Sequence, residues 1–146
     1  MDNTTHRTKR VFLLFTLPLI WLASVAYAVD TSPSFRVLKQ WTIPNGGFGR
    51  ILVLNKPKPT EQQLRSLGDD LQHLTRGDRN AYVAIYDDEK AARHRDAAIS
   101  ERLTKSETKQ HDRHYLGLYV RNANTGHNEF QIYPKGFDGP NIIQNY

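Results

Sequence analysis

Two stretches of the chain alternate apolar and polar side chains with a period of two residues. The first runs from Phe35 to Ile43, and the second runs from His114 to Arg121. This period is typical of strands that bury one face. Three shorter apolar runs between turn-forming residues predict further strands: 51–54, 81–86 and 130–132. Turn-forming residues at 44–47 and 122–126 predict that the first two and the last two strands form hairpins.

A different period, of three to four residues, follows Pro59. Thr60 and Gln63 have the spacing of a capping box at the start of a helix. Four leucines then share one helical stripe: Leu64, Leu67, Leu71 and Leu74. A second amphipathic helix is predicted after the acidic residues 87–89, with a weaker apolar face from Ala91 to Leu103. Residues 105–112 are interpreted as a charged loop.

These elements follow one another as strand, strand, helix, strand, helix, strand, strand. The order predicts an α+β fold with two layers, in which both helices cover one face of a mostly antiparallel sheet of about five strands. A tail rich in glycine and proline follows to Tyr146. No internal repeat is found, and residues 35–146 are predicted to form one domain.

The N-terminal residues have the three zones of an export signal. A polar, basic segment of residues 1–10 precedes the apolar residues 11–26, and Ala26-Tyr27-Ala28 supplies small residues at a peptidase site. We expect cleavage after Ala28, which leaves residues 29–34 as a flexible leader and no membrane span. The predicted location is the periplasm or the extracellular space. An uncleaved anchor is the alternative, because residues 11–29 are just long enough to span a bilayer.

Composition limits the classes of function that fit this chain. The whole chain has 146 residues and no cysteine, which excludes a disulfide scaffold and a lipid-modified cysteine. Without residues 1–28 it keeps 17 Lys and Arg against 14 Asp and Glu, a net charge of +3. So small a charge makes nucleic-acid binding an unlikely function.

Several features come in an order that resembles a small uncharacterised α/β domain of bacterial secreted proteins and lipoproteins. They are Trp41, the 51–54 strand, Leu64, Leu67, Leu71, Ile85-Tyr86-Asp87, Tyr119-Val120-Arg121-Asn122 and Thr125-Gly126-His127-Asn128. The resemblance covers about residues 35–134. It implies a location outside the cytoplasm and no established activity. The missing cysteine sets this chain apart from the lipoprotein members.

His111, Asp112 and His114 form the densest group of chemically reactive side chains. Two imidazoles and a carboxylate can ligate a metal ion or transfer protons. The segment lacks the spacing of a known metal motif, and a solvated polar loop is the alternative. A small secreted hydrolase using these three residues is therefore one hypothesis. No cofactor and no metal ion is predicted.

Aromatic side chains of the last strands suggest a second kind of site. Alternation puts Leu116, Leu118 and Val120 on one face of a strand and Tyr115 and Tyr119 on the other. If the helices cover the leucine face, these tyrosines, Arg121 and Tyr133 lie on an open face, where Tyr and Arg favour binding. The alternative is that a helix or the tail covers that face.

The favoured hypothesis is an exported, non-catalytic module that binds a protein or an envelope component through this open face. A structural subunit of an envelope assembly, joined through an exposed strand edge, is a further alternative. The sequence identifies neither the partner nor the oligomeric state.

Overall fold

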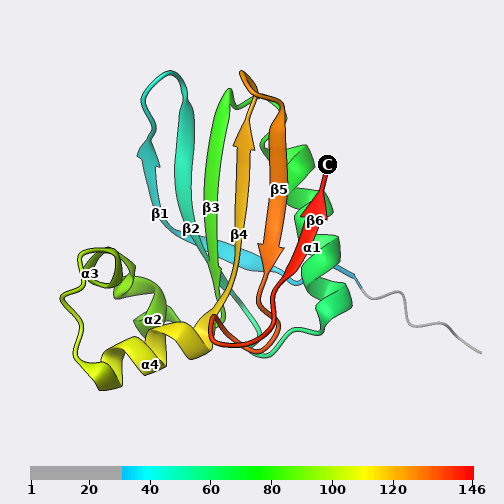
Figure 1. Cartoon of the computed structure of the whole chain (residues 1–146). Helices are drawn as coiled ribbons and strands as arrows, with labels where there is room; N and C mark the ends of the chain where they lie inside the picture. Colours follow the sequence, from blue (N-terminus) through cyan, green and yellow to red (C-terminus); the bar gives the residue numbers. More distant parts are fainter. Residues whose placement is uncertain (1–30) are drawn as a thin grey trace, which may run out of the picture.

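The computed structural model describes residues 31–146. The predicted signal peptide of residues 1–28 and its cleavage site lie outside the described residues. The described part of the chain is an α+β fold built on an open sheet (Figure 1). No helix in residues 31–146 is long and apolar enough to cross a membrane.

Six strands form one sheet, and they lie side by side in the order of the chain. Their bounds are β1 Phe35–Thr42, β2 Gly47–Leu54, β3 Asn80–Tyr86, β4 Tyr115–Asn122, β5 His127–Ile132 and β6 Ile142–Asn145. Neighbouring strands are antiparallel except β2 and β3, which are parallel. Both predicted hairpins are confirmed. In the first, Asn45 and Gly46 have φ values of 68° and 83°, as a tight hairpin turn requires.

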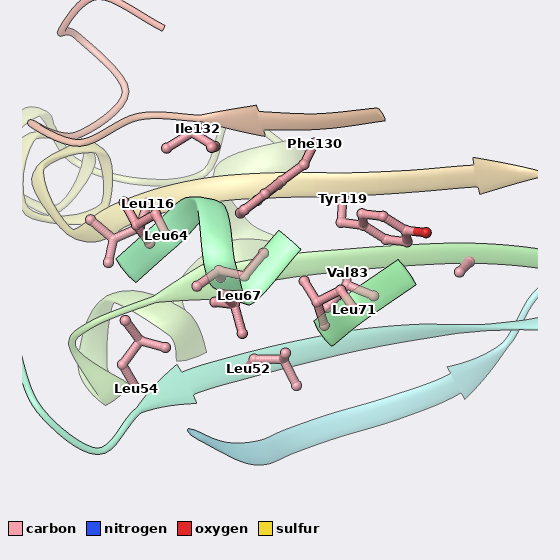
Figure 2. Close-up of a cluster of buried hydrophobic side chains, with 12 residues drawn as sticks. Leu52, Leu54, Leu64, Leu67, Leu71, Val83, Leu116, Tyr119, Phe130 and Ile132 are labelled. Carbon is pink, nitrogen blue, oxygen red and sulfur yellow. The ribbon is translucent and has the colours of Figure 1, made fainter. Parts of the chain in front are cut away.

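Helix α1, Glu61–Leu74, connects the two parallel strands and covers one face of the sheet. The predicted capping box is present, since the Thr60 hydroxyl accepts a hydrogen bond from the Gln63 N–H. Leu64, Leu67 and Leu71 are fully buried, whereas Leu74 is 54% exposed. Figure 2 shows Leu64, Leu67 and Leu71 among the buried side chains of β2 to β5.

Gly68 lies on the same side of α1 as the buried leucines. A Cβ at this position would lie 2.2 Å from the Tyr146 hydroxyl and 2.6 Å from the Phe130 ring, so a larger residue fits only if these two side chains move. The helix can therefore approach the sheet closely, which closes this part of the core.

Three short helices lie on the opposite face and gather near one end of the sheet (Figure 1). They are α2 Glu89–Arg93, α3 Arg95–Ile99 and α4 Lys105–His114. The prediction that both helices share one face is wrong, because Ala91 and Ala92 pack on Ile51 and Val53 while α1 packs on Leu52 and Leu54. Successive residues of β2 point to opposite faces.

Two further expectations are corrected. Residues 105–112 are not a charged loop but most of α4, which Thr104 and Glu107 begin with a second capping box. The tail contributes β6, a sixth strand that pairs with β5.

Candidate functional site

A cleft of about 420 Å³ opens between α3, α4 and the sheet face that the short helices partly cover. Its floor is aromatic, with Tyr82 and Tyr86 from β3 and Tyr115 from β4. Two exposed apolar side chains lie at its rim, Ile99 of α3 at 65% and Phe137 at 52% exposed, together with the exposed Glu101. We call this site the aromatic cleft.

The floor is a continuous group of touching rings. Tyr115 lies 5.2 Å from Tyr86, 5.6 Å from Tyr133 and 5.8 Å from Phe137, measured between ring centres. The His111 ring stacks on Tyr115 at 5.9 Å. Rings held this way on strands present a rigid apolar surface, which loses little entropy when a ligand binds.

A bulge in β4 explains which tyrosines belong to this floor. Tyr86 pairs with Tyr115, but Ile85 pairs with Gly117, so Leu116 is an extra residue. Tyr115 and Tyr119 therefore face opposite sides of the sheet. The prediction that both lie on an open face is wrong for Tyr119, which is fully buried beneath α1.

Tyr119 instead completes the core on the α1 side. Its ring lies 6.5 Å from Phe130 and 6.1 Å from Tyr146, and its hydroxyl accepts a hydrogen bond from Thr75 at 3.2 Å. Arg121, two residues further along β4, follows it onto that side and lines a separate cavity. Of the four predicted binding residues, Tyr115 lines the aromatic cleft, and Tyr133 belongs to the same group of rings.

The predicted histidine group is divided between two places. His111 and Asp112 lie on α4 and line the cleft, with His111 Nδ1 2.9 Å from Asp112 Oδ1. His114 bonds Asp87 at 2.7 Å and is not among the residues that line the cleft. The three side chains therefore do not converge on one point. Residues 31–146 contain no group of three or more His, Cys, Asp or Glu side chains able to hold a metal ion.

His111 also bonds the floor of the cleft, because its Nε2 lies 2.9 Å from the Tyr86 hydroxyl. His111 therefore connects Tyr86 and Asp112, with one ring nitrogen bonded to each side chain. Burial raises the pKa of Tyr86 and of Tyr115 above their usual range. Both phenols are therefore neutral at physiological pH.

Arg95 is the residue of the cleft that the sequence analysis missed. Its guanidinium lies 5.1 Å from the centre of the Trp41 ring and 5.0 Å from that of the Tyr82 ring, and its side chain is only 12% exposed. Its one hydrogen bond among the described residues is a long contact of 3.4 Å to Asp96. Asp96 is itself bonded by Lys39. Arg95 is thus held rigidly by two rings while most of its five N–H donors lack a protein acceptor.

Neither a scan against protein-family models nor searches of curated proteins and of solved structures found a match to this chain. The resemblance to a bacterial extracytoplasmic domain therefore remains a prediction. The function of the chain is inferred from the geometry of residues 31–146.

Proposed function

We propose that the chain is an exported, non-catalytic module that binds a protein partner of the cell envelope in the aromatic cleft. The partner segment inserts an apolar side chain between Ile99 and Phe137 and presents a carboxylate to Arg95. Export rests on the three-zone pattern of residues 1–28. The observation that carries the proposal is Arg95, a nearly buried cation without a strong acceptor beside an exposed apolar rim.

Each part of the cleft has a physical role in this proposal. Insertion of an apolar group between the rim residues removes surface from water that both partners otherwise expose. Arginine matches a carboxylate with two parallel hydrogen bonds, and its fixed position between Trp41 and Tyr82 lowers the ordering cost of forming them. A cleft of about 420 Å³ accommodates one or two side chains rather than a whole domain.

One observation supports the alternative function, a hydrolase. The side chains of Tyr86, His111 and Asp112 form a hydrogen-bonded series in the cleft. Both ring nitrogens of His111 are occupied, and Tyr86 is fully buried. A general base needs a nitrogen within reach of the substrate proton. This arrangement favours a positioning role, in which the series fixes α4 against β3 and keeps the cleft open.

The test compares variants of four residues in one binding assay. Three of the residues line the cleft, and the fourth is an exposed apolar residue away from it. A partner is first isolated from envelope extracts with the processed chain and then purified. Ile99→Asp, Phe137→Asp and Arg95→Gln should each weaken its binding at least about tenfold, which corresponds to roughly 1.4 kcal/mol. Leu74→Asp is the matched control, because Leu74 is 54% exposed but lies on α1, away from the cleft.

Circular dichroism and thermal melting establish that each variant is folded before its affinity is compared. Equal losses in Leu74→Asp and Ile99→Asp would contradict the proposal, as would unchanged binding in Phe137→Asp. A metal-dependent or hydrolytic activity that disappears in His111→Ala while partner binding persists would favour the enzyme instead.

A further inference from the structure

A second cavity, of about 480 Å³, lies on the other side of the sheet from the aromatic cleft. It is bounded by the C-terminal end of α1, the turn between β4 and β5, and the last residue, Tyr146. Four of its lining side chains are basic or can become so: His73, Arg76, Arg121 and His127. We call it the basic cavity.

The two arginines of this cavity have no acidic partner. No Asp or Glu residue lines the cavity, and neither Arg76 nor Arg121 forms an ion pair in residues 31–146. The nearby acids have other partners, since Asp78 pairs with Arg50 at 2.8 Å and Asp69 accepts a hydrogen bond from Gln144 at 3.0 Å. Glu129 lies two residues after His127 on the same face of β5, and its carboxylate approaches His127 Nε2 at 3.6 Å, so the two arginines are the cations of this cavity without an acidic partner in residues 31–146.

An unpartnered amide adds to the argument. Asn128 pairs with Arg121 across β4 and β5 and lines the same cavity. Its side-chain oxygen is buried and has no hydrogen-bond partner. Buried polar groups are rarely left unsatisfied, and an amide rotated by half a turn offers N–H donors at that position instead. A ligand with several acceptor oxygens would satisfy both the amide and the arginines.

We propose that the basic cavity binds a phosphate group. Two guanidinium groups, an amide and two histidines supply donors from several directions, whereas a carboxylate could engage only part of this set with its two oxygens. Arginine recognises phosphate with paired, charge-assisted hydrogen bonds. The phosphate belongs either to a soluble compound or to a lipid headgroup, and the two sources share this chemistry. The proposal is independent of the function of the aromatic cleft, which lies on the other face.

The experiment titrates the purified chain with inorganic phosphate at constant ionic strength and follows backbone amide signals by nuclear magnetic resonance. We expect saturable shifts that centre on Arg76, Arg121 and Asn128. Arg76→Gln and Arg121→Gln should each weaken the apparent affinity at least about tenfold. Arg65→Gln is the matched control, because Arg65 lies on α1, does not line the cavity and is paired with Glu61 at 2.9 Å.

Arg76 is exposed, so its substitution leaves the fold intact even if Arg121→Gln does not. Shifts that never saturate, or an affinity that falls equally in Arg65→Gln, would overturn the proposal. A second arm uses vesicles of phosphatidylcholine with and without phosphatidic acid. Recruitment by phosphatidic acid that depends on Arg76 assigns the phosphate to a lipid headgroup, and phosphate binding without recruitment assigns it to a soluble compound.

Discussion

The two faces of the sheet are covered in opposite ways. On one face a single helix of 14 residues buries three leucines completely against strands β2 to β5. On the other face α2 and α3, of five residues each, contribute mainly Ala91 and Ala92. Because leucine removes far more apolar surface from water than alanine, the α1 face supplies most of the hydrophobic stabilisation.

The face with the short helices is held by directional contacts instead. Arg95 forms cation–π contacts with two rings, Tyr86 is hydrogen-bonded to His111, and side chains of β1 form ion pairs with residues of α2 and α3. Such contacts fix positions without filling all of the space between elements. The comparison teaches that the α1 face is closed beneath its leucines and keeps a cavity only beyond the C-terminal end of the helix, whereas on the other face the cleft lies among the short helices themselves.

The largest expected effect tests the closed face. Leu67→Ala or Leu71→Ala should cost about 2–5 kcal/mol of unfolding free energy, because each removes a fully buried side chain and leaves a cavity. Urea denaturation monitored by circular dichroism measures the loss. Ile99→Ala, on the rim of the cleft, should change stability by less than about 0.5 kcal/mol. Comparable losses at Leu67 and Ile99 would refute the contrast between the faces.

Local signals in the sequence were sufficient to predict the helix that covers the α1 face. The spacing of Leu64, Leu67 and Leu71, together with the capping box at Thr60, predicted a helix that the structure confirms. Long, strongly periodic segments are the part of a fold that pattern analysis identifies best.

The structure of the other face was harder to predict from the sequence, for two physical reasons. Helix α4 has no buried residue and a low apolar content, so periodicity gave no signal, although Thr104 and Glu107 have the spacing of a capping box that reveals its start. The bulge at Leu116 reverses the faces of β4 beyond it, and alternation read from one end of the strand put Tyr119 on the wrong side. Such a shift depends on pairing with β3, which a single strand does not encode.

The candidate site was predicted in part for the same reason. Tyr115 was singled out as a binding residue, and His111 and Asp112 as residues of an alternative hydrolase site, whereas the structure brings all three to one cleft. Arg95 was not singled out as a site residue, because its position in the cleft depends on contacts with Trp41 on β1 and Tyr82 on β3. Contacts between distant segments appear only once the strand order is known.

An intermediate effect is expected from pH and tests the floor of the cleft. Burial raises the pKa of Tyr115 in the folded chain above its ordinary value of 10.0. Above pH 10 the unfolded chain therefore loses this proton first, and stability falls as the pH rises further, by roughly 1.4 kcal/mol per pH unit for one such tyrosine. Below pH 10 this contribution is constant. Tyr115→Phe should show a shallower decline between pH 10 and 11 in urea unfolding, and parallel declines would contradict it.

The smallest effect concerns the ion pairs that connect β1 to the short helices. Lys39 bonds Asp96, and the two side chains are 49% and 56% exposed. Exposed pairs contribute at most about 1 kcal/mol, because water screens them and both side chains lose freedom. A double-mutant cycle of Lys39→Gln and Asp96→Asn should therefore give a coupling energy between zero and about 1 kcal/mol.

The pH dependence of that coupling identifies its origin. The hydrogen bond from Lys39 lowers the pKa of Asp96 below its ordinary value of 3.8. A lowered carboxyl pKa stabilises the fold at pH values above 3.8, and the stabilisation is lost as the pH falls through the folded-state value. The coupling energy should accordingly be constant between pH 5 and 7, decline below about pH 4, and shrink in 1 M NaCl at any pH because the Debye length is then about 3 Å. A coupling that survives both treatments would mean that packing between the two side chains, rather than charge, connects α3 to β1 at this point.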